Sequence, residues 1–172
     1  MTTRSIQLPV GASTPFTIAD IERTPDDGGR YELSNGVLVV TPAAGVPHQI
    51  IQSNLIELLR HQLGTGSYVL ADTDLALRDD MLKRPDVQVV ERAIGLGPRI
   101  TGTPTLVVEI ASRSTVVFDR TEKRVAYAEG GIPSYWLVDP QTTSVTVLSL
   151  RGSEYVEVEP PAWLDVVAVF AT

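Results

Sequence analysis

The chain has 172 residues, of which 43% are hydrophobic and 20% charged, and these proportions suit a single globular domain. It has no cysteine, which excludes disulfides, thiolate metal sites and a thiol nucleophile and is compatible with a reducing cytoplasm. Its formal net charge of −7 argues against tight nonspecific binding of nucleic acid, because phosphate contacts require Lys and Arg.

Neither end nor middle of the chain carries a targeting or membrane pattern. Residues 1–10 contain one arginine and no long apolar run, so we expect no signal peptide. No stretch approaches the roughly 18 apolar residues of a membrane span. Because no repeat or linker divides the sequence, we expect one domain over residues 1–172 and a cytoplasmic protein.

A short helix and a hairpin are expected near the N-terminus. Thr17 is the expected N-cap of the helix, which ends before Pro25. Residues 30–33 and 37–40 then flank Asn35-Gly36, a dipeptide typical of tight hairpin turns.

A long helix and a group of strands follow the hairpin. Pro47 suits the first turn of that helix, which the apolar spacing extends through Gln62 and which Gly64 and Gly66 terminate. Four strand-like runs come next, at residues 68–71, 75–77, 86–90 and 105–110. The last two runs are almost continuously apolar, as in strands that are buried on both faces of a sheet.

The C-terminal part completes an α/β pattern. A second helix over residues 117–129 leads into a strand at residues 135–138, and residues 144–150 and 155–158 form an antiparallel extension. Because a crossover helix favours parallel neighbouring strands, we expect a mixed central sheet flanked by helices.

Two carboxylates interrupt the buried strands. Asp86 begins one of them, and Glu109 lies near the end of the next. An ionised carboxylate in an apolar run is costly unless it is paired or binds a cation. Mg²⁺ or Mn²⁺ would relieve the repulsion between the two, and the backbone carbonyl of Ile110 would add a further hard oxygen ligand. The alternative is that Asp86 caps a strand turn and that Glu109 pairs with an arginine.

Periodicity leaves Glu32 and His48 open to more than one interpretation. Alternation in the hairpin places Glu32 opposite its apolar neighbours, which predicts that it faces solvent. His48 shares the inward face of the long helix with Ile51. It is therefore either a group beside the metal site, or a proton acceptor, or a neutral histidine that caps the core.

Periodicity also places Lys123 on a solvated face. Val125 belongs to the expected apolar stripe of the second helix, whereas Asp119, Lys123 and Tyr127 lie opposite, with a weak Asp–Lys pair worth about 0.3 kcal/mol.

Motifs of competing chemistry are missing, because the sequence has no phosphate-binding Gly-Lys-Ser/Thr loop, no His-Glu-x-x-His pair and no Gly-x-Ser-x-Gly elbow.

Six short segments carry a resemblance to a known family. In chain order they are RYELSNG at residues 30–36, PH at 47–48, RPDV at 84–87, VVEIAS at 107–112, DRTEK at 119–123 and YAEGGIPSYWLVDP at 127–140. In this order and spacing, residues 30–140 are similar to the Uma2 family of restriction-endonuclease-like proteins.

The resemblance implies a restriction-endonuclease-like core and a PD-(D/E)xK type of site. It implies that Asp86 and Glu109 hold the metal, that Glu32 is a further acidic ligand and that His48 lies beside the site. The lysine of the strict motif, two residues after Glu109, is replaced here by alanine.

The resemblance also assigns that missing lysine to another element. In this family the lysine appears on the crossover helix, and there it matches Lys123. Only the resemblance, and not the periodicity, gives Lys123 a role in the site.

The implied activity is Mg²⁺- or Mn²⁺-dependent hydrolysis of DNA phosphodiester bonds. A homodimer, formed through the hairpin and the C-terminal strands, would present two sites to two DNA strands. One alternative is a non-catalytic nucleic-acid-binding or regulatory module that retains the fold, which the acidic composition and the missing motif lysine favour. Another is a hydrolase that acts on a different phosphate compound.

Overall fold

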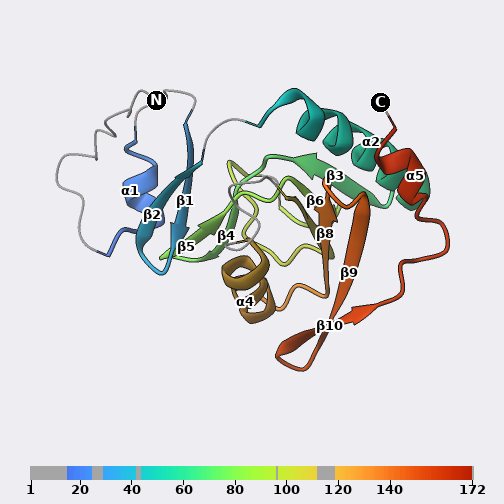
Figure 1. Ribbon diagram of the computed structural model, residues 1–172. Coiled ribbons are helices and arrows are strands. Elements are labelled where there is room, and N and C mark those ends of the chain that lie inside the picture. Colours follow the sequence, from blue (N-terminus) through green and yellow to red (C-terminus); the bar gives the residue numbers. More distant parts are fainter. Residues whose placement is uncertain (1–14, 25–28, 42–43, 96, 112–118, 172) are drawn as a thin grey trace.

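The chain contains both helices and strands in the computed structural model (Figure 1), which describes residues 15–24, 29–41, 44–95, 97–111 and 119–171. Within these residues the elements are α1 (Ile18–Ile21), β1 (Arg30–Ser34), β2 (Val37–Thr41), α2 (Val46–Leu63), β3 (Ser67–Ala71), β4 (Leu75–Arg78), β5 (Met81–Lys83), β6 (Val87–Glu91), β7 (Leu106–Ile110), η1 (Asp119–Lys123), α4 (Arg124–Glu129), β8 (Ser134–Asp139), β9 (Ser144–Arg151), β10 (Glu154–Val158) and α5 (Val166–Val169).

The central sheet is mixed, as the sequence predicts. It has six strands in the order β10-β9-β8-β7-β6-β3, and β7 and β8 run parallel while its other neighbouring pairs are antiparallel. The parallel pair is the one joined through η1 and α4. A crossover returns the chain to the end of the sheet at which the preceding strand began, so the next strand runs in the same direction. The strands β9 and β10 form the predicted antiparallel extension.

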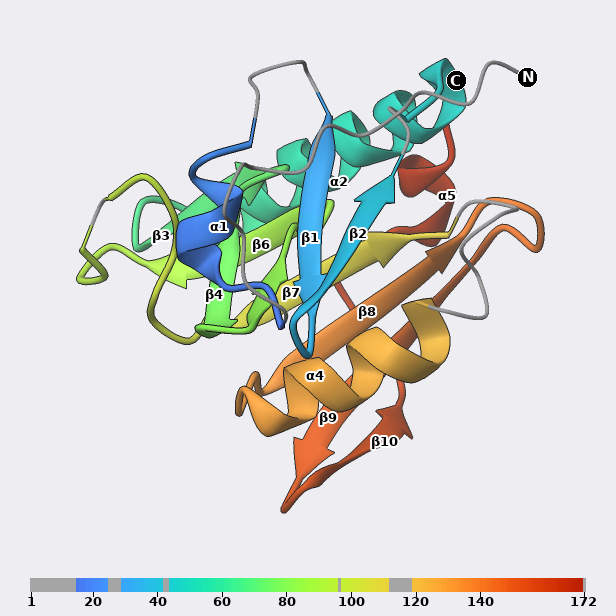
Figure 2. The same ribbon diagram turned by 90° about the vertical axis from the view of Figure 1, so that its left-hand side faces the viewer.

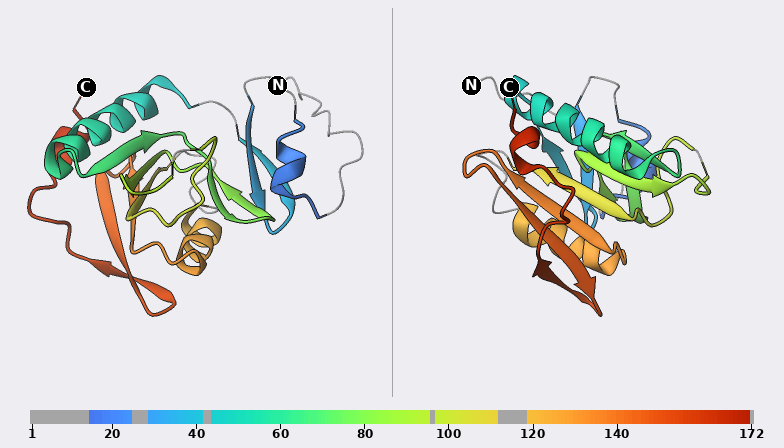
Figure 3. Two further views of the ribbon diagram at one scale, coloured as in Figure 1. Left: turned by 180° about the vertical axis from the view of Figure 1, so that it is seen from behind. Right: turned by 90° about the vertical axis from the view of Figure 1, so that its right-hand side faces the viewer.

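Helices cover both faces of this sheet (Figures 1 and 3). On one face, α2 and α5 pack against the alternate residues Val108 and Ile110 of β7. On the other face, Tyr127 of α4 packs against Val107 of the same strand. Because both faces are buried, the strands read as continuous apolar runs, and a carboxylate within them is enclosed by protein.

The N-terminal hairpin belongs to a second, four-stranded sheet in the order β2-β1-β5-β4. The predicted turn is present, with φ of 49° at Asn35 and 73° at Gly36, the left-handed values that a tight hairpin requires. The strand β5 was not predicted, because three residues ending in a lysine show no usable alternation. Figure 2 shows β1 and β2 crossing in front of the six-stranded sheet.

The predicted orientation of the second helix is wrong. Its described part is a π-helical segment, η1, followed by α4, and the predicted first residues, 117 and 118, lie outside the described part. Val125 is 55% exposed, whereas Tyr127 is buried in the core with its ring 5.2 Å from that of Tyr135. Thr121 is exposed as well, so the helical spacing of the stripe is kept, but its members face solvent while Lys123 and Tyr127 face inward.

Among the described residues, no helix is long and apolar enough to cross a membrane.

Candidate active site

The candidate active site lies where β6 begins and β7 ends. Val87 pairs with Val108 in the antiparallel β6–β7 ladder, so the register places Asp86 and Glu109 opposite each other, one step further along. The hairpin supplies Glu32, the first turn of α2 supplies His48 and η1 supplies Lys123. Five residues that are far apart in the sequence therefore converge on one end of two paired strands.

Asp86 is buried and held by three groups. Its Oδ2 accepts a hydrogen bond from the backbone N–H of Ile110 at 2.7 Å and lies 3.2 Å from Nε2 of His48, while Nη2 of Arg30 lies 3.5 Å from Oδ1. Burial alone would raise the pKa of Asp86, but the His48 imidazole, the Ile110 N–H and Lys123 together hold that pKa below its ordinary value. Asp86 is therefore an ionised carboxylate at neutral pH.

Glu109 is held through both of its carboxylate oxygens on the α4 side of the sheet. Lys123 donates from Nζ to Oε2 at 2.9 Å, and the Tyr127 hydroxyl donates to Oε1 at 2.5 Å. The pKa of Tyr127 is raised well above its ordinary value by burial and by the neighbouring charges of Glu109 and Glu32, so its hydroxyl remains a donor. The described partners of Glu109 are therefore a lysine and a tyrosine.

Glu32 is buried, so the prediction that it faces solvent is wrong. Its neighbours Tyr31 and Leu33 are buried as well, which means that β1 is covered on both faces. Alternation indicates a solvent face only where one side of a sheet is open to water. Oε1 of Glu32 lies 3.7 Å from Nζ of Lys123, which therefore stands between two carboxylates.

Lys123 is 6% exposed, so the predicted solvated face is also wrong. The expectation of a weak pair with Asp119 concerns a side chain that lies outside the described part of the structure. The contacts of Lys123 with Glu109 and Glu32 show that the ammonium group points into the site.

The sequence matches the Uma2 family, described as "Putative restriction endonuclease", over residues 18–171. The chain belongs to the Uma2 family. A solved structure similar to this Uma2 chain is the crystal structure of a putative nuclease belonging to DUF820 from Anabaena variabilis ATCC 29413. The two share 18% identity with a TM-score of 0.76, over 91% of this chain and 98% of the other. The likeness shows a shared fold, in agreement with the predicted restriction-endonuclease-like core. The search of curated proteins found no match.

In this Uma2 chain, the polar face of β1 adds Arg30 and Ser34, which the sequence did not single out, to the predicted Glu32. Arg30, Glu32 and Ser34 alternate along the strand, and each contacts a residue at or beside the site: Asp86, Lys123 and Lys83 respectively. The signal that would have found them is this period-2 spacing of polar residues, read together with burial.

The donor atoms of the Uma2 site suit a divalent metal. Among the described residues, no three His, Asp or Glu side chains gather closely enough to enclose an ion. Mg²⁺, however, is held in many phosphate-handling sites by one or two carboxylates, waters and the substrate itself. The carboxylates of Asp86 and Glu109, the Ile110 carbonyl and a third acidic residue, Glu32, are the hard oxygen donors that such an ion prefers, so the donor set fits.

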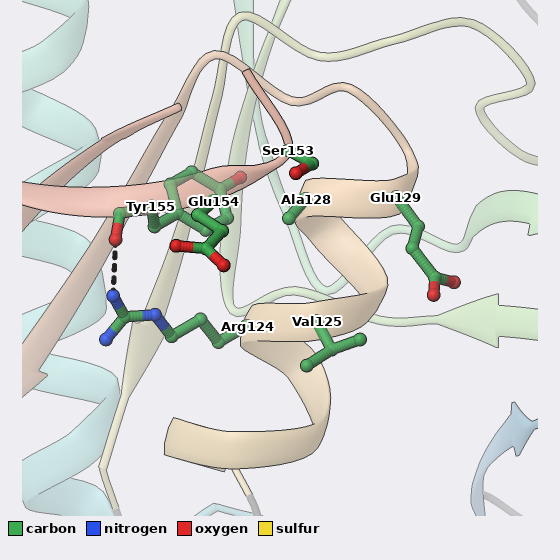
Figure 4. A pocket seen from close by; sticks show the side chains of 7 residues that line it. All are labelled: Arg124, Val125, Ala128, Glu129, Ser153, Glu154 and Tyr155. Carbon is green, nitrogen blue, oxygen red and sulfur yellow. Dashed lines mark hydrogen bonds between the residues drawn. The ribbon is translucent and has the colours of Figure 1, made fainter. Parts of the chain in front are cut away.

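A pocket of about 400 Å³ lies elsewhere, between α4 and the β9–β10 turn (Figure 4). Its lining includes Val125 and Glu129 of α4 and Glu154 of β10, and Arg124 donates to the backbone carbonyl of Tyr155 beside it. None of the five site residues lines it. The pocket is therefore separate from the site formed by Asp86, Glu109 and Lys123.

Proposed function

We propose that this Uma2 protein is a metal-dependent nuclease that hydrolyses DNA phosphodiester bonds. The family description and the fold shared with a protein described as a nuclease support this proposal. The observation that carries it is the placement of Asp86 and Glu109 opposite each other on buried paired strands, with Lys123 bound to Glu109. Fold alone would not be sufficient, because one fold supports many activities.

Asp86, Glu109 and the Ile110 carbonyl would hold a Mg²⁺ or Mn²⁺ ion, and Glu32 would contribute to a second. When bound, the ion lowers the pKa of a water molecule and offsets the charge that develops on the phosphate.

The side chains around these ligands orient the reacting groups. The ammonium of Lys123, which lies beside Glu109, orients the attacking water, and its positive charge favours loss of the water proton to solvent and offsets negative charge. His48 and the Ile110 N–H fix the Asp86 carboxylate by occupying Oδ2, which leaves Oδ1 directed toward the side of Arg30.

Calorimetric titration of Mg²⁺ and Mn²⁺ tests this proposal, with the variants Asp86→Ala and Glu109→Ala and cleavage of plasmid DNA in Mn²⁺ as the second measurement. We expect both variants to lose metal binding and cleavage. Glu57→Gln, on the exposed side of α2, is the matched control and keeps both. Plasmid cleavage that is unchanged in both alanine variants would exclude these two carboxylates as the active site.

A non-catalytic module that binds nucleic acid is the second candidate. The net charge of −7 and the alanine at position 111 favour it, because the motif lysine is absent from its usual place. Such a module would bind DNA equally well in EDTA and in metal and would cleave none. Hydrolysis of a simple phosphodiester such as bis(p-nitrophenyl) phosphate without cleavage of DNA would instead favour a hydrolase of another phosphate compound.

We propose a cytoplasmic homodimer as the working form. The strand β2 lies at one edge of its sheet and exposes 62% of Val37, and β10 lies at the edge of the other sheet. A two-fold dimer through such an edge would give one nuclease site for each DNA strand. Sedimentation equilibrium tests the dimer, and a monomer at all concentrations would contradict it.

A further inference from the structure

The chain contains two lysines, Lys83 and Lys123, and both are buried. Lysine is among the residues that are least often fully buried, and when it is buried it has a charged partner. All other basic side chains of the sequence, apart from the histidines, are arginines. Lys83 is 0% exposed, yet the reaction proposed above makes no use of it.

Lys83 reaches from β5 to the segment that carries Lys123. Its Nζ donates to both carboxylate oxygens of Glu122, at 2.7 and 2.8 Å, and to the hydroxyl of Ser34. Hydrogen bonds between charged groups are the stronger and more directional kind. The contact therefore fixes Glu122 against the four-stranded sheet.

Glu122 and Lys123 are consecutive residues of the π-helical segment η1. The first is bound to β5 by Lys83, and the second is bound to β7 by Glu109 and lies near Glu32 of β1. We propose that Lys83 is a positioning residue, which acts through Glu122 to hold η1 so that Lys123 points at Glu109. The inference rests on the proposed function of Lys123 in the nuclease reaction.

The balance of charge explains why the Lys83–Glu122 ion pair affects the position of Lys123. Among the ion pairs of the described residues, the carboxylates of Glu32, Glu109 and Glu122 contact the ammonium groups of Lys83 and Lys123. Without Lys83, the carboxylate of Glu122 competes for Lys123. Without Glu122, the ammonium of Lys83 competes for Glu32, which lies on the same face of β1 as Ser34. Loss of Lys83 would therefore displace Lys123, and loss of Glu122 would displace Glu32.

Stability alone does not account for the pair. A buried ion pair is often no more stabilising than apolar residues of the same volume, whereas loss of one partner leaves a costly unpaired charge. A variant that removes both charges should therefore regain stability. The same variant should still lack the ion pair that holds η1 to β5. Recovered stability without recovered positioning of Lys123 therefore separates a positioning role from a structural one.

Lysine acetylation tests the proposal, because Lys123 is the sole side-chain amine that remains after Lys83→Met. N-hydroxysuccinimidyl acetate is applied to wild type, Lys83→Met, Glu122→Gln and the double variant, and modification of Lys123 is quantified by mass spectrometry. We expect all three variants to react at least about tenfold faster at Lys123, the factor that loss of one charge-assisted hydrogen bond gives. The double variant should melt closer to wild type than Lys83→Met does.

The control is Glu22→Gln, which breaks a pair of the same 2.7 Å length with Arg99 away from the site and should leave Lys123 protected. If Lys83→Met does not fold, Glu122→Gln and the double variant decide. Protection of Lys123 at the wild-type level in any folded variant would overturn the proposal.

Cleavage of DNA in Mn²⁺ is the second readout. We expect Lys83→Met and the double variant to lower kcat with KM unchanged, because the group displaced acts in the reaction and not in holding the substrate. A wild-type protein that cleaves no DNA would defeat the proposed function alone, since the acetylation experiment still reports whether Lys83 positions Lys123.

Discussion

Tyr127 donates its hydroxyl hydrogen to Glu109 from a fully buried position, although periodicity assigned it to a solvated face. Asp86 and Glu109 could be predicted because a carboxylate in an apolar strand needs a compensating charge. Periodicity and polarity could not predict Lys123, Tyr127 and Lys83, which occur in segments where polarity is ordinary, and only the family resemblance pointed to Lys123. What makes them part of the site is burial, which is a property of the packed molecule.

Removal of the Tyr127 hydroxyl tests its role. We expect Tyr127→Phe to lower the free energy of unfolding by about 1–3 kcal/mol, because a buried carboxylate oxygen loses its donor. Urea denaturation measures this change. Tyr155→Phe is the matched control, since that hydroxyl donates to the Ile132 carbonyl outside the site, and it should lose stability while keeping DNA cleavage. If Tyr127 also acts in the site, Tyr127→Phe should cleave DNA more slowly than Tyr155→Phe. Equal cleavage by both variants would show that Tyr127 has only a structural role.

The lowered pKa of Asp86 predicts a pH dependence of stability. The folded protein holds Asp86 ionised at a lower pH than the unfolded chain does, so this contribution is complete above the ordinary value of 3.8 and is lost as pH falls through the folded pKa. Below pH 4 we expect Asp86→Asn to show a shallower slope of unfolding free energy against pH, by up to about 1.4 kcal/mol per pH unit. Chemical denaturation between pH 3 and 5 gives the slope, and identical slopes would contradict the shift.

At the scale of elements, the hairpin, the long helix and the strands of the six-stranded sheet were predicted within a few residues. Their apolar periods are long enough to define a face, and Asn35-Gly36 has a strong turn preference. The strand β5 and the orientation of α4 were missed. Three residues cannot show a period, and the inward face of η1 and α4 carries Lys123 and Tyr127, which bind Glu109, so polarity pointed to the wrong side.

A matched pair of substitutions tests which side of α4 faces the core. Val125→Gln should change the free energy of unfolding by less than about 0.5 kcal/mol, as is usual for an exposed site. Ala126→Gln should lower it by about 1–3 kcal/mol, because Ala126 is 3% exposed and a larger polar side chain does not fit. Thermal unfolding ranks the two. The opposite ranking would restore the face that the apolar stripe predicted.

At the scale of the whole molecule, a net charge of −7 opposes the approach of DNA. We expect DNA affinity to depend on a divalent cation in the site, because the carboxylates there would otherwise repel the phosphates. Fluorescence anisotropy with a labelled duplex should show binding in Ca²⁺ and little binding in EDTA. Ca²⁺ is chosen as a cation that the carboxylates coordinate without cleavage of the DNA. Equal affinity in both buffers would favour the non-catalytic binding module.

The junction between the two sheets has a consequence for how the molecule opens. The face of β1 that meets the site is polar, and the buried residues Leu33 and Leu82 of the four-stranded sheet belong to neither of the apolar clusters that surround the six-stranded sheet. A layer of charges resists water entry less than an apolar core does, so local opening should start there. Amide hydrogens of β1 should exchange with deuterium faster than those of β7 and β8. Local unfolding of β1 would move Glu32 away from Lys123, so the event that admits solvent would also disrupt the site.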